Sequence, residues 1–321
     1  AEVAEEVLAS GAVPVSAGTD VLLRRAPRLR GGAALPPVAD AGDDRVINAI
    51  ERTCASKAKG ESLGYQEWTM GYVLGEVLQR VTGKTLAELL DQKLTQPLGL
   101  DGLHIGLPAH ERHRVAELIM PGFIHAGVPR RVFSSVFGVA DHAFGAVGLR
   151  SRPTEALASG WPRGLSSMDF NSQAFRAAAI PSVNGMYTAH SLARLFAPLS
   201  QGGVLEGKRL ISEATLHEAT RDQSAGVDLV VPFPLRFKLG YMRPVSLGLP
   251  LEVLGKRRDL GVASPLAFGH FGFGGSGAWA DPQRQLSVGI VANSFFGKLP
   301  IDLRTVALCT AAAFAADHRA G

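Results

Sequence analysis

Cysteine is scarce in this sequence, with only Cys54 and Cys309 among 321 residues. The two lie far apart and lack the close pairing that is typical of metal-ligand cysteines. This spacing indicates no cysteine-based metal site, and it neither establishes nor excludes a disulfide. It favours a reducing compartment in which both cysteines fill apolar interior positions.

Long apolar runs and dense charge are missing as well. No run approaches the roughly 18 to 20 apolar residues that a membrane-spanning helix needs, so we expect no membrane span. Charged residues make up 19% of the chain, the formal net charge is +4, and the basic residues form no stripe interleaved with aromatics. Because a nucleic-acid interface needs such a stripe, we expect no nucleic-acid partner. The composition leaves the oligomeric state open.

Apolar residues, at 46% of the chain, suffice for a sizeable core. Residues 1–40 show no clear pattern, and we expect a poorly defined N-terminal segment there, before a main domain over residues 41–321. Apolar spacing and capping residues predict the helices of that domain. They are expected over 45–53, 69–82 with a stop at Gly83, 85–94 with a Thr85/Glu88 capping box and an end at Pro97, 188–200, from Ser212 onward, and 301–316.

Strand patterns gather near the C-terminus, whereas residues 104–180 are irregular and predict surface excursions of the kind that often line a site. Strands are expected near 237–243, 266–271, 276–280 and 286–293, with a polar turn over 281–285. The glycines after His270 would let a ligand approach the backbone closely. The predicted fold class is α/β, a mainly antiparallel sheet packed against helices, with a mostly helical part over about 45–235 and the sheet plus C-terminal helix over about 236–321.

Four stretches carry a resemblance to a known family. They are "GYQEWTMGYVLGEVLQRVTGKTLAELLDQKLTQPLGLDGLHIGLP" (64–108), "PSVNGMYTAHSLARLFAPLSQGGVLEGKRLIS" (181–212), "FKLGYM" (237–242) and "FGHFGFGGSGAWADPQRQLSVGIVANS" (268–294). Together, and in this order, they resemble the beta-lactamase-related serine hydrolases, which include class C beta-lactamases, penicillin-binding DD-peptidases and esterases. The resemblance implies a beta-lactamase/transpeptidase-like fold and a small acyl or ester substrate, with no cofactor and no metal.

The family's mechanism implies roles for particular residues here. A serine in a Ser-x-x-Lys turn is the nucleophile, a tyrosine is the base, and a Lys or His followed by x-Gly on an edge strand helps to bind the acyl group. A serine hydroxyl needs such a base, and the oxyanion needs N–H donors. By the resemblance, Tyr65 is the tyrosine, His270-Phe271-Gly272 is the strand motif, and the N–H of Phe273 is an oxyanion donor.

The first motif departs from the commoner form of the family. Glu67 and Trp68 occupy the region where a Tyr-x-Asn asparagine would stand. Some esterase-like members lack that asparagine too, so the departure weakens antibiotic hydrolysis more than family membership. Outside the resemblance, Tyr65 could be a packing residue before a helix, and His270 a hydrogen-bonded residue at a strand end.

The nucleophile has no convincing counterpart in the sequence. The one Ser-x-x-Lys, Ser56 to Lys59, lies only a few residues before Tyr65, whereas the family places its serine far upstream. Ser16 has Thr19 where the lysine should be. We therefore expect Ser56 to be a surface turn and the catalytic serine to be missing from this chain. Two explanations stay open: residues preceding Ala1, since the chain does not begin with Met, or an inactive family member that serves as a binding or scaffolding module.

Two further patterns, a cluster of histidines and a glycine-rich segment, resemble ligand-binding motifs but do not predict a binding site. The histidines 104, 110 and 113 cluster loosely, but without cysteines or a helical His-Glu-x-x-His pattern they indicate a polar loop, and no metal site is expected. "FGFGGSG" looks like a phosphate-binding loop, yet it leads into a strand instead of a helix with Gly-Lys-Ser/Thr. Nucleotide binding is therefore not expected.

Overall fold

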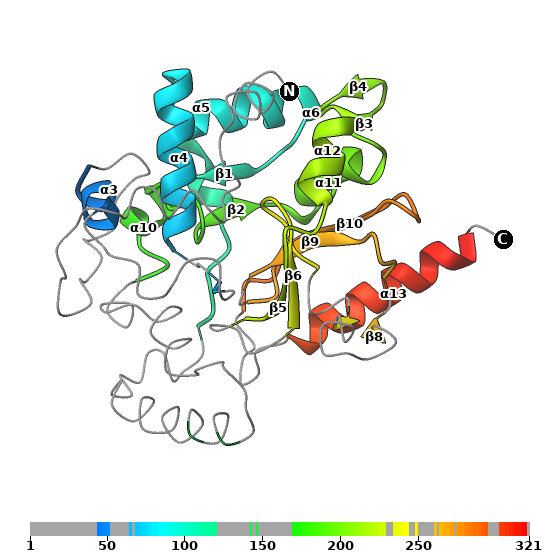
Figure 1. Ribbon diagram of the computed structural model, residues 1–321. Helices are drawn as coiled ribbons and strands as arrows, with labels where there is room; N and C mark the ends of the chain where they lie inside the picture. Colours follow the sequence, from blue (N-terminus) through cyan, green and yellow to red (C-terminus); the bar gives the residue numbers. More distant parts are fainter. Residues whose placement is uncertain are drawn as a thin grey trace.

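The computed structural model describes residues 44–51, 64–65, 68–120, 142, 146, 169–228, 234–243, 248–249, 260–261, 263–272, 274–294 and 302–319. The expected N-terminal segment, Cys54, Ser16 and Ser56 lie outside these residues. The described chain contains both helices and antiparallel strands, in agreement with the predicted α/β class (Figure 1). In chain order they are α3 (Asp44–Glu51), α4 (Thr69–Thr82), α5 (Leu86–Leu90), a π-helical turn (Asp91–Thr95), α6 (Gln96–Leu98), β1 (Leu103–Ile105), a 3-10 helix (Ala109–Arg114), α10 (Gln173–Ala177), β2 (Gly185–Tyr187), α11 (Ala189–Ser200), β3 (Val204–Leu205), β4 (Lys208–Arg209), α12 (Glu213–Thr220), β5 (Ser224–Val227), β6 (Pro234–Phe237), β7 (Gly248–Leu249), β8 (Leu260–Gly261), β9 (Phe268–Phe271), β10 (Gly277–Asp281), β11 (Leu286–Ile290) and α13 (Leu303–Arg319).

The predicted helix ends coincide with local capping interactions. Helix α4 ends at Gly83, which takes the left-handed conformation, and the Thr85/Glu88 capping box at the start of α5 is formed in both directions. Thr188 and Ser212 cap α11 and α12 by accepting a backbone N–H with their side chains. These helix starts were predictable because capping depends on residues only two or three positions apart.

The expected stop at Pro97 is wrong. The helical turns continue past α5 through the π-helical turn and α6, and they end at Gly99, which is left-handed with φ 59°. Pro97 lies in the first turn of α6. A proline is tolerated there because the N–H that it lacks is not needed to close a hydrogen bond.

The C-terminal meander is confirmed. Strands β9, β10 and β11 pair antiparallel in the order β11-β10-β9, with Ala278 opposite His270 and Trp279 opposite Val288. Gln285, with φ 51°, lies in the turn between β10 and β11. The segments "GAWA" and "LSVGI" are therefore neighbouring strands, as predicted from two apolar runs separated by a polar turn.

The strand expected near 237–243 has a different form. Strand β6 ends at Phe237, and the chain then reverses, with the Lys238 N–H donating to the Tyr241 carbonyl at 2.8 Å. Gly240 has φ +75°, a conformation that glycine adopts without strain, and it makes this reversal possible. Met242 returns to form single bridges with Phe237 and Gly269. Thus "FKLGYM" is a tight turn that links β6 to β9.

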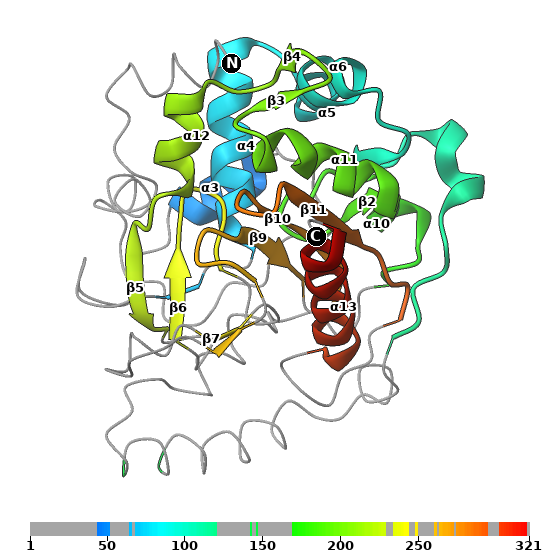
Figure 2. The same ribbon diagram turned by 90° about the vertical axis from the view of Figure 1, so that its right-hand side faces the viewer.

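The sheet lies between two helical layers (Figure 2). The fully buried Trp279 packs with Cys309 and Ala313 of α13, so Cys309 is an interior residue as expected. Its neighbours Phe268 and Ala280 pack instead with Leu199 of α11 and Leu216 of α12. Successive side chains of a strand point to opposite faces. Helix α13 therefore covers one face, and α11 and α12 cover the other.

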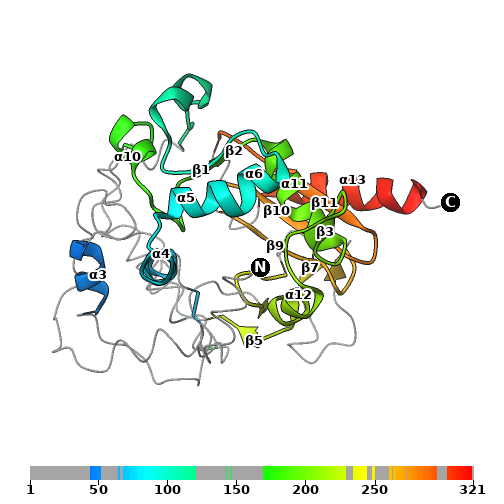
Figure 3. The same cartoon turned by 90° about the horizontal axis from the view of Figure 1, so that it is seen from above.

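Helices α3 and α4 form a second core away from α13 (Figure 3). Tyr72 of α4 is buried, together with Val46 of α3 and Ile180. Three members of the apolar pattern that predicted α4, Met70, Val77 and Val81, are exposed. The periodicity correctly predicted a helix, but the face that packs most deeply is the one carrying Tyr72 and Gly75.

A close approach between backbones joins α11 to the sheet. A Cβ at Gly289 of β11 would lie 2.5 Å from the Ala189 carbonyl oxygen and 2.7 Å from the Ala193 nitrogen. Both atoms belong to helix backbone, which cannot move aside as a flexible side chain can. Glycine at this position therefore sets how closely α11 packs on β11.

Gly289→Ala should lower the free energy of unfolding by about 1–3 kcal/mol, because the added methyl group overpacks this contact. Urea unfolding followed by circular dichroism measures the change. Gly64→Ala is the matched control, since a Cβ there meets no atom of the described residues within 4 Å, and it should change stability by at most about 1 kcal/mol. Equal midpoints for the two variants would show that the contact at Gly289 can relax.

Candidate active site

Tyr65 and His270 meet although they are 205 positions apart. The Tyr65 Oη and His270 Nε2 atoms are 2.8 Å apart, a hydrogen bond between two partly buried side chains. Tyr65 precedes α4, and His270 lies on β9 at one edge of the three-stranded sheet. The resemblance led us to expect a separation within about 10 Å, the reach of general-base chemistry across one substrate, and the observed contact meets that expectation.

A third ring belongs to this contact. The Tyr65 ring lies nearly parallel to His270, with centroids 6.0 Å apart and an interplanar angle of 18°. It also lies nearly parallel to Phe237, at 6.2 Å and 13°. Phe237 was not among the predicted site residues. Its stretch "FKLGYM" was the only signal for it, and that stretch does not reveal which side chain faces the tyrosine.

The electrostatics of His270 follow from its position. Burial lowers the pKa of His270 below its ordinary value of 6.5. The imidazole is therefore neutral at neutral pH, with a proton on one of its two nitrogens. In either tautomer Nε2 and the phenol oxygen share one hydrogen bond, so a proton can move along the line between them.

The backbone after His270 forms a tight turn. The Gly272 N–H donates to the Ser276 carbonyl at 2.8 Å, and the Gly275 N–H donates to the Gly272 carbonyl at 2.9 Å. The Gly272 N–H is thus used inside the turn, and what Gly272 can offer a substrate is the space left by its missing side chain. Phe271 ends β9 opposite Gly277, and Phe273 lies outside the described residues.

Helix α13 holds this turn from the other side. Gly275 has φ +80°, and its carbonyl accepts a hydrogen bond from the buried Thr305 hydroxyl at 3.0 Å. The Ser276 hydroxyl accepts from the Ala292 N–H at 2.9 Å. The several glycines near His270 therefore belong to a turn whose backbone is tied to both α13 and the end of β11.

The histidines near residue 110 have local structural contacts. His113 Nδ1 lies 2.9 Å from the His110 carbonyl, and His104 is on β1 opposite Met186. Desolvation lowers the pKa of His104. Within the described ranges, no group of three or more metal-ligating side chains is placed to hold an ion. Among all the residues that the structure describes, no helix is long and apolar enough to cross a membrane.

Comparison with known proteins gives a consistent set of relatives. The beta-lactamase family model matches residues 22–312. The esterase/beta-lactamase LipL of Mycobacterium tuberculosis is 31% identical over 261 residues, which are 80% of this chain and 54% of LipL. A penicillin-binding protein homologue from Caulobacter crescentus is 31% identical with a TM-score of 0.64, covering 85% of this chain and 64% of its own.

A family VIII carboxylesterase is 28% identical with a TM-score of 0.63, and the match covers 85% of this chain and 63% of that structure. EstA from Arthrobacter nitroguajacolicus, at 23% identity and a TM-score of 0.67 over 94% of this chain and 73% of its own, shares the fold. The chain spans 54% of the length of LipL and under two thirds of the first two structures.

The lowered pKa of His270 gives stability a pH dependence on the acid side. Between that pKa and about 6.5, the unfolded chain binds more protons at this site than the folded chain does. Stability should therefore fall as the pH drops through this window, and this contribution should be constant above it. In His270→Gln the curve of unfolding free energy against pH should be flatter as the pH falls below about 6.5.

Urea unfolding at a series of pH values checks the prediction, and the two curves are compared by subtraction so that titrations common to both proteins cancel. Tyr241→Phe serves as a control, because Tyr241 contacts Phe196 and Phe268 edge-on and is not the partner of His270. Parallel curves for wild type and His270→Gln would contradict the inferred burial of the imidazole.

Proposed function

The chain belongs to the beta-lactamase family, and from this premise we propose that it carries the residues that transfer protons in an esterase-type acyl-transfer site. The observation that carries the proposal is the hydrogen bond between Tyr65 Oη and His270 Nε2 at 2.8 Å. The names of two relatives, an esterase/beta-lactamase and a carboxylesterase, support an ester over other acyl substrates. The substrate class is a small ester or acyl compound.

In this proposal Tyr65 is the base and proton shuttle. As its phenol oxygen takes the proton from an attacking hydroxyl, its own proton passes to Nε2 of the neutral His270 ring. The phenol then gives a proton to the departing alcohol and regains one from His270, so the C–O ester bond breaks as a new acyl C–O bond forms. His270 thus holds the transferred proton between the two steps. The proposal assigns substrate binding to Phe271, Gly272 and Phe273, with the N–H of Phe273 as the oxyanion donor.

Under the same proposal, no residue of this chain is the serine that becomes acylated. The one Ser-x-x-Lys begins at Ser56, too close in sequence to Tyr65 for the family's arrangement. This observation also supports a second candidate function, a family member that binds acyl compounds without turning them over. The Glu67-Trp68 pair, standing where the asparagine of Tyr-x-Asn would be, makes a beta-lactam a poorer candidate than an ester.

The 321-residue chain should form no acyl-enzyme with a penicillin or a p-nitrophenyl ester. Removing the nucleophile from a catalytic unit leaves only binding and oxyanion stabilisation, a loss of several powers of ten in turnover. Intact-mass spectrometry after incubation with each probe tests this expectation. An adduct on Ser56 would overturn our interpretation of that tetrad as a surface turn, and an adduct on another serine would identify a different nucleophile.

The same measurement separates the two candidate functions. A form extended before Ala1 by a segment with a Ser-x-x-Lys turn is the comparison protein. Acylation of that form alone would support the hydrolase, whereas the absence of an adduct on both forms would support the binding module.

Binding of the simple ester ethyl butyrate tests the site without requiring turnover. Tyr65→Phe should weaken the binding of ethyl butyrate roughly 3- to 10-fold, because a hydrogen-bonding oxygen at the acyl site contributes about 0.5–1.5 kcal/mol. Saturation-transfer NMR or calorimetry measures the dissociation constant. Tyr241→Phe is the matched control and should bind as the wild type does. Equal weakening by both variants, or by neither, would place the ester site elsewhere.

A further inference from the structure

The orientation of Tyr65 is not determined by regular secondary structure around it. Gly64 and Tyr65 belong to no helix or strand, and α4 begins only at Thr69. A tyrosine side chain has free rotation about two bonds, and only some of the resulting positions bring Oη to His270 Nε2. Contacts from other parts of the chain must therefore fix the plane of this ring.

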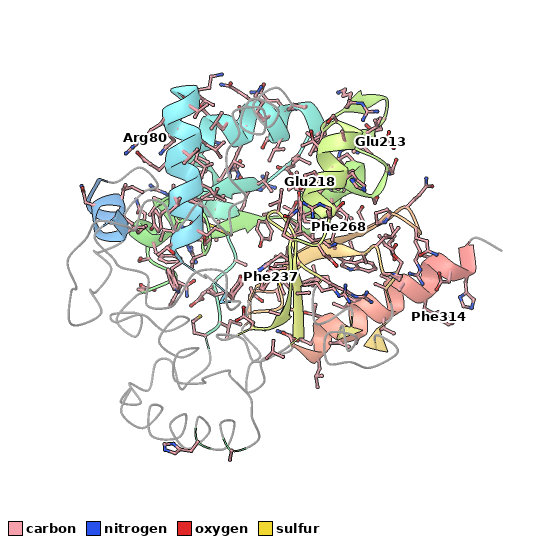
Figure 4. All side chains as sticks on the ribbon, in the orientation of Figure 1. Arg80, Glu213, Glu218, Phe237, Phe268 and Phe314 are labelled. Carbon is pink, nitrogen blue, oxygen red and sulfur yellow. The ribbon has the colours of Figure 1, made fainter. Side chains whose placement is uncertain are left out.

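Phe237 provides such a contact from a rigid element. Its ring is within 13° of parallel to that of Tyr65, with centroids 6.2 Å apart. Figure 4 labels Phe237 on β6, in the central region of the molecule. Its backbone is held on both sides. Phe237 pairs with Ser224 of β5, its carbonyl accepts from the Gln223 N–H at 2.8 Å, and it forms an antiparallel bridge with Met242.

The same framework holds His270. The Met242 N–H donates to the Gly269 carbonyl at 3.0 Å, and the Gly269 N–H donates to the Met242 carbonyl at 2.9 Å. Gly269 directly precedes His270 on β9. Met242 thus links the two segments: its bridge to Phe237 is held by hydrogen bonds of the flanking residues, and its bridge to Gly269 by its own backbone N–H and carbonyl. Tyr65 arrives from a distant part of the sequence and contacts both rings.

We propose that Phe237 is a positioning residue for Tyr65: its ring sets the plane of the phenol ring so that Oη meets His270 Nε2. The inference deepens the proposed function and rests on it for the catalytic meaning of the Tyr65–His270 bond. A stacked aromatic pair has a preferred geometry, and an aliphatic side chain of similar size lacks it.

The test follows the titration of His270 by two-dimensional NMR, in the absence of any ester. In Phe237→Leu the midpoint for His270 should rise by about 0.5–1 pH unit towards the ordinary value, because the Tyr65 ring loses its fixed plane and water reaches the imidazole. Phe237→Tyr keeps the ring and should retain the wild-type midpoint. Phe314→Leu is the matched control, since Phe314 packs beside another histidine, His318, on the distant α13 (Figure 4).

A double variant shows whether Phe237 acts through Tyr65. With Tyr65→Leu in place there is no ring to orient, so adding Phe237→Leu should move the His270 midpoint no further. Phe237→Met is made alongside, to keep a long apolar side chain if leucine leaves too large a cavity. Urea unfolding confirms that each variant is folded before titration.

Three results would each overturn the inference. The first is an unchanged His270 midpoint in folded Phe237→Leu or Phe237→Met, and the second is a shifted midpoint in Phe237→Tyr. The third is a shift in the Tyr65→Leu background equal to the shift seen with Tyr65 present. The outcome is independent of turnover. A protein that shows the Phe237-dependent shift but does not bind ethyl butyrate would contradict the proposed function and leave the positioning role standing.

Discussion

The arrangement of this protein depends on how closely α11 can approach the C-terminal sheet. Gly289 allows the backbone of β11 to lie against the helix backbone at Ala189 and Ala193, where a Cβ would collide. This contact fixes β11 under α11, and β11 in turn fixes β10 and β9 by antiparallel pairing. Trp279 then fills the opposite face against α13. Strand β9, which carries His270, is thus positioned by the packing of β11 against α11, two strands away.

The candidate site lies where this sheet meets the segment that leads into α4. A hydrogen bond between Tyr65 Oη and His270 Nε2 joins the two parts. Burial that keeps the imidazole neutral has a cost in stability at acid pH, but it also gives the tyrosine a partner that can share a proton. A site whose residues come from different parts of the fold can hold such a pair only if the surrounding framework is rigid. The bridge through Met242 and the turn tied to Thr305 provide that rigidity.

Prediction from the sequence succeeded where the determining residues are near neighbours. The helix starts at Thr85, Thr188 and Ser212 were predicted correctly because the capping interactions form within one helical turn. It failed at Pro97, where a π-helical turn shifts the start of the next helical segment, and in "FKLGYM", where Gly240 reverses the chain. Both errors concern the backbone conformation itself: a π-helical turn before Pro97 and a positive φ at Gly240.

The sequence by itself determined the family, the meander around His270 and the pairing of Tyr65 with His270 as candidate partners, because these depend on motifs and on local periodicity. Only the tertiary structure decided which face of α4 is buried, that the Gly272 N–H is used within its turn, and that Phe237 stacks on Tyr65. These last features arise from contacts between segments far apart in the chain. The spacing of residues within one segment cannot specify how the ring of Phe237 lies against the ring of Tyr65, because the two residues belong to distant segments.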